Sequence, residues 1–120
     1  GKVERVHGIV GHKASSARLA DLLSESIVGY TRGDCFSTSS ELSEVNGEKS
    51  IIFSSDGIDY LPSQKVVICV DVLTLDGSIE STIDAIHGAD GIILPFVLVL
   101  DNRSGLKEIS GKKIASLITR

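Results

Sequence analysis

The sequence is poor in several residue types that mark special classes of protein. Its 120 residues include no methionine, no tryptophan, two cysteines, two prolines and only 4% aromatic residues. Two cysteines outside a Cys-x-x-Cys motif do not form a disulfide framework, so a reduced, cytoplasmic protein is expected. The lack of methionine indicates either a processed start or a piece of a longer chain. With 42% hydrophobic and 23% charged residues, the composition is that of one globular domain over residues 1–120.

Long apolar runs and basic clusters are also missing. The longest apolar stretch, residues 92–100, has the length of a strand and contains Pro95, so no membrane span is expected. Residues 1–10 carry charges but no apolar core, so no secretory signal is expected. Acidic residues outnumber basic ones by 16 to 12. Without a cluster of lysines and arginines, nucleic acid is not an expected partner.

Short β-branched runs alternate with amphipathic stretches along the chain. Helices are predicted from Ser16 through Ser24 and over residues 79–88, and strands at residues 6–10, 27–31, 50–54, 65–70, 92–100 and 114–118. Residues 33–48 lack a sustained period and predict a long loop. Continuous apolar runs are typical of strands buried on both faces. The pattern predicts an α/β fold, a single domain with a mostly parallel, twisted sheet flanked by helices.

The most informative stretch is residues 66–78, which read Val-Val-Ile-Cys-Val-Asp-Val-Leu-Thr-Leu-Asp-Gly-Ser. It predicts a buried strand that ends in an acid, a short polar loop and the start of a helix. Ligands bind at the carboxyl ends of parallel strands, and the unpaired N–H groups at a helix start suit a phosphate. Asp71 is placed to accept hydrogen bonds from sugar hydroxyls. Asp76, Gly77 and Ser78 fit equally well a plain turn and helix N-cap.

This stretch resembles the signature of the type I phosphoribosyltransferases, and most of all that of the orotate branch. Residues 11–20, Gly-His-Lys-Ala-Ser-Ser-Ala-Arg-Leu-Ala, resemble the family's pyrophosphate loop and the helix after it. Residues 96–101 resemble the strand that leads to the base-binding acid, and residues 113–119 resemble the final strand. The resemblance implies the type I phosphoribosyltransferase fold. It also implies transfer of the phosphoribosyl group of PRPP to a nucleobase, a pyrimidine such as orotate, with release of pyrophosphate.

The resemblance also assigns the residues of the site. It implies that Asp71 and Arg32 are catalytic and that Asp101 and Arg103 bind the base. The residues that it assigns to PRPP are Lys13, Ala14, Ser15, Ser16, Thr74, Leu75, Asp76, Gly77 and Ser78. No residue is assigned as a metal ligand, although Mg²⁺ is the implied cofactor with PRPP as co-substrate. A homodimer is expected, and residues 33–48 are expected to close over the site as a lid.

Some positions depart from the family's pattern. Val70 stands where an acid normally precedes Asp71, and Ser15 stands where the pyrophosphate loop has a lysine. Asp76 would bring a carboxylate next to a phosphate, at a cost of about 1 kcal/mol at 4 Å in water. Besides a phosphoribosyltransferase, two alternatives therefore stay open. One is a non-catalytic nucleotide-sensing or regulatory domain, and the other is a catalytic core completed by a second chain. His12, which belongs to the stretch that resembles the pyrophosphate loop, is a further candidate for ligand contact.

Overall fold

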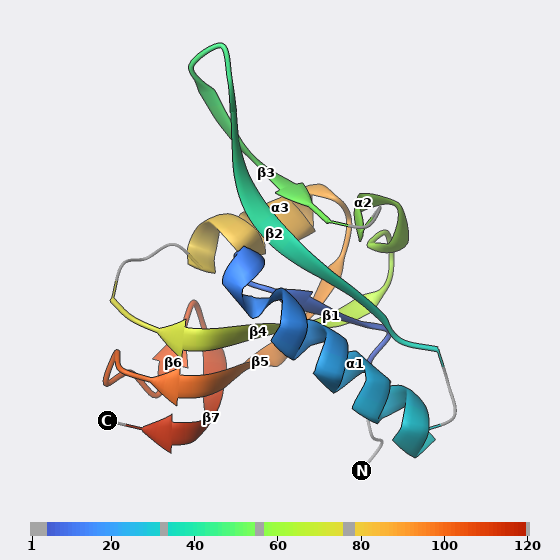
Figure 1. The fold of residues 1–120 in the computed structure, drawn as a ribbon, viewed down its shortest axis with the longest axis vertical. Coiled ribbons are helices and arrows are strands. Elements are labelled where there is room, and N and C mark those ends of the chain that lie inside the picture. The colour runs from blue at the N-terminus through green and yellow to red at the C-terminus, as the bar shows by residue number, and fades with distance from the viewer. Residues whose placement is uncertain (1–4, 32–33, 55–56, 76–78, 120) are drawn as a thin grey trace.

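Strands and helices alternate in the computed structural model, which describes residues 5–31, 34–54, 57–75 and 79–119 (Figure 1). The elements in chain order are β1 (Gly8–Gly11), the 3₁₀ helix η1 (Ala14–Ser16), α1 (Ala17–Thr31), β2 (Phe36–Val45), β3 (Glu48–Phe53), α2 (Gly57–Tyr60), β4 (Lys65–Leu73), α3 (Ile79–Gly88), β5 (Ile92–Asn102), β6 (Glu108–Ile109) and β7 (Lys112–Thr119). The predicted helix at residues 79–88 is α3. Five of the six predicted strands are confirmed as β1, β3, β4, β5 and β7.

Parallel pairing dominates the sheet, whose strand order is β3-β2-β1-β4-β5-β7-β6. β1 pairs in parallel with β2 and β4, and β5 pairs in parallel with β4 and β7. Two hairpins add β3 and β6 as antiparallel strands at the two sides. The predicted α/β fold with a mostly parallel sheet is confirmed. In this topology the carboxyl ends of β1, β4 and β5 meet at one edge of the sheet, where α/β proteins bind ligands.

Helices cover both faces of the sheet (Figure 1). On one face α1 packs over a buried cluster that contains Ile9, Ala20, Val67 and Cys69. On the other face β4 contributes Val66, Ile68 and Val70 to a cluster with Ile79, Ile83 and Ile86 of α3. Successive side chains of a strand point to opposite faces, so β4 supplies both cores in alternation. This double burial explains why residues 65–70 form one continuous apolar run.

The predicted strand at residues 27–31 is wrong, because α1 continues without interruption to Thr31. The β-branched pair Ile27 and Val28 suggested a strand. Leu19, Leu23 and Ile27, however, follow the four-residue spacing of a helix, and all three pack on the α1-side cluster. Burial of this apolar stripe outweighs the weak local preference of β-branched residues for strands.

The long loop predicted at residues 33–48 is also wrong, because β2 and β3 form an antiparallel hairpin that extends beyond the body of the sheet (Figure 1). Asn46 and Gly47 make its two-residue turn with φ values of 53° and 81°, as a type I′ turn requires. Most of the arm is exposed, so its strands lack an apolar alternation. The segment that was expected to close over the site as a lid is therefore a hairpin arm, and its closure stays a prediction.

Candidate functional site

The loop after β1 lies against the end of that strand. Gly11 closes β1, and a Cβ atom added there would lie 2.6 Å from the carbonyl oxygen of Ser16 and 2.9 Å from its carbonyl carbon. Both are backbone atoms, which cannot swing aside as the tip of a side chain can. Only glycine therefore lets η1 pack so closely on the strand. This approach places Ser15 and Ser16 beside the carboxyl end of β4.

Asp71 is the point where β4 meets this loop. Its Oδ1 accepts a hydrogen bond from Ser16 Oγ at 3.2 Å, and Ser15 Oγ lies 3.5 Å from the same oxygen. The backbone N–H of Val72 also donates to Oδ1, at 2.8 Å. The N–H of Asp71 donates to Ser16 Oγ at 3.1 Å. Three predicted site residues from two distant segments therefore lie together at the carboxyl edge.

Lys13 has a backbone conformation that residues other than glycine rarely adopt. Its φ of 68° and ψ of 163° lie in a region that costs roughly 1–3 kcal/mol. Its N–H donates to Ser40 Oγ of β2 at 3.0 Å, which ties the loop to the base of the hairpin. The side chains of Lys13 and Ala14 are exposed. Strain of this kind gathers at functional sites, so it singles out this turn of the loop.

His12 turns into the interior behind the loop. It is only 6% exposed, and its Nδ1 lies 2.8 Å from Oγ1 of Thr82 in α3. Thr82 Oγ1 is in turn 2.8 Å from Ser40 Oγ. His12 thus contacts α3, whereas the sequence left it as a candidate for ligand contact.

Sequence reasoning missed both Ser40 and Thr82. Ser40 falls in the stretch that was predicted to be a long loop, yet it lies in β2 and is 2% exposed. Thr82 is fully buried on the same side of α3 as Ile79, Ile83 and Ile86. A hydroxyl on the apolar stripe of a helix was the available signal, because a buried polar group needs a hydrogen-bond partner.

The predicted phosphate loop follows β4. Thr74 and Leu75 are exposed, Leu75 by 72%. The other predicted members Asp76, Gly77 and Ser78, together with Arg32, lie outside the described residues. β4 ends at Leu73 and α3 begins at Ile79, so the predicted strand and helix on either side of this segment are confirmed. The first N–H groups of an α-helix have no partner inside the helix, which is the property that favours an anion at this position.

The two predicted base-binding residues lie one strand further along the same edge. Asp101 stands opposite Val72 in the pairing of β5 with β4. Arg103 Nε donates to Asp101 Oδ2 at 2.9 Å, and the N–H of Arg103 donates to the carbonyl oxygen of Leu73. Asp101 is buried and the Arg103 side chain is about half exposed. These two hydrogen bonds fix the positions of Asp101 and Arg103 beside the end of β4.

Asn102 shapes the turn behind this pair, and sequence reasoning missed it. It is 2% exposed, and its Oδ1 accepts hydrogen bonds from the N–H and the hydroxyl of Ser104. Its Nδ2 donates to the carbonyl oxygen of Leu106. An asparagine that binds backbone groups two and four residues ahead fixes the exit of the chain from β5.

Val70 explains why only one acid ends β4. It is 2% exposed and belongs to the core on the α3 side, opposite to the side on which Asp71 meets η1. An acid at this position would be buried among apolar side chains. The departure from the two-acid pattern is therefore part of the packing of the core.

Neither cysteine of the chain is an activated thiol. Burial raises the pKa of the Cys69 thiol to about 12, and the charge of Asp71 adds to the shift. Burial also raises the pKa of Cys35, against a smaller opposing effect of Arg5. Neither thiol is ionised at neutral pH, so neither is an activated nucleophile. Over the described ranges, no group of three His, Cys, Asp or Glu side chains could hold a metal ion.

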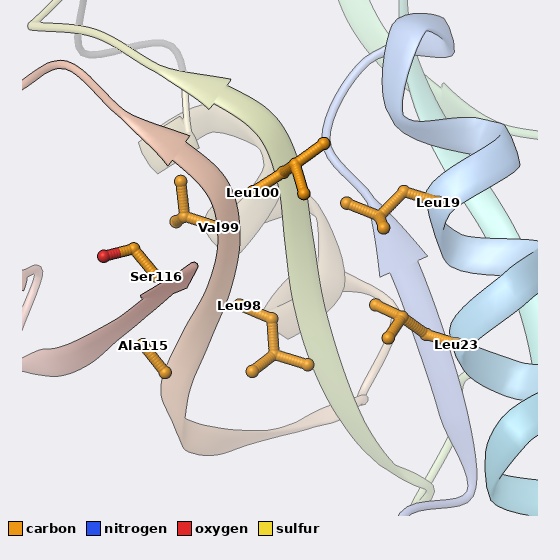
Figure 2. A pocket seen from close by; sticks show the side chains of 7 residues that line it. All are labelled: Leu19, Leu23, Leu98, Val99, Leu100, Ala115 and Ser116. Atoms are coloured by element: carbon orange, nitrogen blue, oxygen red, sulfur yellow. The ribbon is translucent and has the colours of Figure 1, made fainter. Parts of the chain in front are cut away.

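Two hollows lie away from the site. One is an apolar groove of about 320 Å³ between α1 and strands β5 and β7 (Figure 2). It is lined by Leu19, Leu23, Leu98, Val99, Leu100, Ala115 and Ser116. The other, of about 420 Å³, is lined by Arg5, His7, Asp34, Phe36, Asp59, Tyr60, Pro62 and Gln64 at the opposite edge of the sheet. The first offers a single hydroxyl. The second combines Asp34 and Asp59 with Arg5 and His7, and it lies at the amino ends of the parallel strands, away from the edge where α/β sheets bind ligands. Within the part of the chain that the structure describes, no helix has the length and apolar character to cross a membrane.

Comparison with known proteins relates the chain to others through its structure. No protein-family model and no curated protein sequence matches it. The adenine phosphoribosyltransferase of Thermoanaerobacter pseudethanolicus superposes with a TM-score of 0.66 at 21% identity, over 97% of this chain and 72% of that one. The orotate phosphoribosyltransferase of Aeropyrum pernix gives 0.69 at 20% identity, over 96% of this chain and 61% of that one.

A third similar structure contains a nucleotide. It is a Neisseria gonorrhoeae protein with bound ppGpp, which matches with a TM-score of 0.56 at 13% identity, over 96% of this chain and 68% of that one. The adenine and orotate enzymes and this protein share one arrangement of strands and helices with the present chain. The chain therefore has the type I phosphoribosyltransferase fold, as its motif at residues 66–78 indicated.

Proposed function

We propose that the carboxyl edge of the sheet binds PRPP with Mg²⁺ and transfers its phosphoribosyl group to a nucleobase, with release of pyrophosphate. The observation that carries this proposal is the contact of Asp71 with Ser15 and Ser16. It joins the segment assigned to ribose with the segment assigned to pyrophosphate. In PRPP these two groups are covalently attached to each other, so a site for PRPP must hold them side by side.

Each part of the site has a role that follows from its chemistry. Asp71 offers carboxylate oxygens to the ribose hydroxyls, which are hydrogen-bond donors. The exposed residues Lys13, Ala14 and Ser15 offer the pyrophosphate an ammonium group, a hydroxyl and backbone N–H groups, and the buried Ser16 ties this loop to Asp71. Residues 74–78 and the start of α3 receive the 5′-phosphate. Arg32 keeps its proposed catalytic role from the sequence resemblance alone.

Mg²⁺ fits this site as a companion of the substrate. It usually binds through one or two carboxylates together with substrate phosphates and waters, so Asp71 suffices on the protein side. When bound, the ion would offset the negative charge that builds up on the departing pyrophosphate. The protein has few positive groups with which to do this, since its basic residues are outnumbered 12 to 16.

The base is proposed to be a pyrimidine such as orotate, bound at Asp101 and Arg103. A guanidinium fork suits a carboxylate such as that of orotate, because it can donate two parallel hydrogen bonds. Arg103 already donates to Asp101, so the base must share or replace that bond. Adenine and hypoxanthine are the competing bases, since enzymes for both have this fold.

A second candidate function is non-catalytic nucleotide sensing. One observation favours it: where the family has a second acid at the end of β4, this chain has Val70, whose side chain is buried in the core. The similar protein with bound ppGpp shows a ligand of this class on the same fold.

The quaternary state and location are proposed along with the function. We propose a homodimer, because the hairpin arm exposes Leu42 and Val45 by 66% and 64%. The free thiols of Cys35 and Cys69 are in keeping with a reducing compartment, and the cytoplasm is the proposed location.

Calorimetric titration of PRPP with Mg²⁺ tests the proposed site. Wild-type protein should bind PRPP, and Asp71→Asn should bind it at least about tenfold more weakly, since a charge-assisted hydrogen bond to ribose is lost. Asp59→Asn, at the opposite edge of the sheet, is the matched control and should bind like wild type. No binding by wild type at millimolar PRPP would refute the proposal.

Product analysis separates the two candidate functions. Incubation with PRPP, Mg²⁺ and either orotate, adenine or hypoxanthine should release pyrophosphate with orotate if the protein is the proposed enzyme. PRPP binding without turnover of any base would favour the sensing function instead. In that case titration with guanosine polyphosphates would be the next comparison.

A further inference from the structure

A chain of buried polar groups lies directly behind the loop at residues 12–16. Lys13 N–H donates to Ser40 Oγ at 3.0 Å, Ser40 Oγ lies 2.8 Å from Thr82 Oγ1, and Thr82 Oγ1 lies 2.8 Å from His12 Nδ1. Ser40, Thr82 and His12 are 2%, 0% and 6% exposed. The groups come from β2, α3 and the loop itself. Their hydrogen bonds, called the polar link below, connect the loop to β2 at the base of the hairpin and to α3.

The distances favour one direction of hydrogen-bond donation along this link, from Ser40 to Thr82 to His12. Ser40 Oγ accepts from Lys13 and has one hydrogen of its own to donate. If it donates to Thr82, the Thr82 hydroxyl donates to an unprotonated His12 Nδ1, and both contacts are 2.8 Å. In the reverse direction the Ser40 hydroxyl must end on the carbonyl oxygen of Gly11 at 3.5 Å, which is too long for a good bond. In the first arrangement every hydrogen of the link therefore has an acceptor within 3.0 Å, including the Lys13 N–H on Ser40.

Lys13 is the residue that needs such support. Its φ of 68° and ψ of 163° are strained for a side chain, and strained conformations persist only where their surroundings hold them. The bond to Ser40 holds its N–H, and Ser40 is itself oriented by Thr82. The same turn starts η1, whose Ser15 and Ser16 meet Asp71. A shift at Lys13 would therefore move the whole proposed pyrophosphate loop.

Valine has nearly the same shape as threonine, so packing alone does not require the hydroxyl of Thr82. Its neighbours on this side of α3 are Ile79, Ile83 and Ile86, all buried in the apolar core. Burying a hydroxyl there lowers stability unless it is hydrogen-bonded. The position keeps a polar group that joins α3 to His12 and Ser40.

We propose that Thr82, acting through Ser40 and His12, is a positioning residue that holds Lys13 in the conformation needed to bind pyrophosphate. This inference rests on the proposed function, because it concerns the pyrophosphate half of the same site. Thr82 touches no substrate. Its hydroxyl joins α3 to the loop that is proposed to bind pyrophosphate.

The test uses two variants of Thr82 and one matched control. Thr82→Val keeps the shape and removes the hydroxyl, and Thr82→Ser keeps the hydroxyl. Thr38→Val removes another buried hydroxyl, one that donates to the carbonyl oxygen of Ser54 and does not contact the loop. Affinity for inorganic pyrophosphate with Mg²⁺ and for PRPP is measured by calorimetry, and stability by urea denaturation. The amide signal of Lys13 is followed by NMR.

Thr82→Val should bind pyrophosphate about tenfold more weakly than wild type and shift the Lys13 amide signal, because the buried bonds of the Thr82 hydroxyl to both Ser40 and His12 are lost. Thr82→Ser should bind within about twofold of wild type. Thr38→Val should lose stability with unchanged affinity. Equal affinity of Thr82→Val and wild type, or an equal loss in Thr38→Val, would overturn the inference alone. Wild-type protein that binds neither pyrophosphate nor PRPP would overturn it together with the proposed function.

Discussion

Replacing Gly11 with alanine tests whether the candidate site depends on the close packing of η1 against β1. The added Cβ would lie 2.6 Å from the Ser16 carbonyl oxygen, whereas ordinary contact begins at 3.4 Å, so η1 must move by about 0.8 Å. Overpacking of this kind costs about 1–3 kcal/mol. For a domain of this size the melting temperature should fall by roughly 4–12 °C. The same shift would pull Ser16 away from Asp71 and weaken PRPP binding.

The matched control for this change is Gly29→Ala in α1. Nothing lies within 4 Å of a Cβ atom at Gly29, and alanine is favoured in a helix by about 0.5–1 kcal/mol. Urea denaturation should therefore show opposite signs for the two glycine-to-alanine changes. If Gly11→Ala were as stable as Gly29→Ala, the close packing of η1 on β1 would be refuted. The assignment of residues 13–16 to the site would lose its structural basis as well.

Two further predictions concern β4. Val70→Asp introduces the family's second acid but places it in the core. The free energy of unfolding should therefore fall by roughly 3 kcal/mol or more, without a gain in PRPP affinity. A stable variant that binds PRPP more tightly would contradict the burial of this position. The pKa of Cys69 is raised from 9.0 to about 12 on folding, so its contribution to stability is complete below pH 9 and is lost as the pH rises toward 12. Urea denaturation between pH 8 and 11 should show a steeper decline for wild type than for Cys69→Ala, by up to about 1.4 kcal/mol per pH unit, and equal slopes would contradict the assignment.

The buried strands and the helix after β4 could be predicted from the sequence, because their side chains carry a clear signal. The apolar run of residues 65–70 reflects burial on both faces of the sheet, and Ile79, Ile83 and Ile86 mark one side of α3. The β2–β3 hairpin could not be predicted in this way. Its arm is largely exposed, so the polar residues along it show no alternation, and the Asn46–Gly47 turn was the only local sign.

The position of Asp71 at the carboxyl end of a buried strand could be predicted from the sequence, because an acid ends an apolar run there. The contacts of Ser40 and Thr82 could not be predicted, because they arise across the fold; the hydroxyl of Thr82 on an apolar helix stripe indicated only that it needs a partner. Ser40 meets Lys13 and Thr82 only after β2 pairs with β1 and α3 packs on the sheet. The strain of Lys13 is likewise a property of the folded backbone, which no spacing of residue types indicates.

The central claim is that PRPP binds at the carboxyl edge of the sheet, and amide chemical shifts measured during a titration test it most directly. Addition of PRPP with Mg²⁺ to labelled protein should shift the amide signals of residues 12–16 and 71–75 most strongly. The same signals should shift clearly less in Asp71→Asn at equal concentrations, in keeping with its weaker binding. Shifts confined to the groove of Leu19 and Leu98, or to the pocket of His7 and Asp59, would contradict the account.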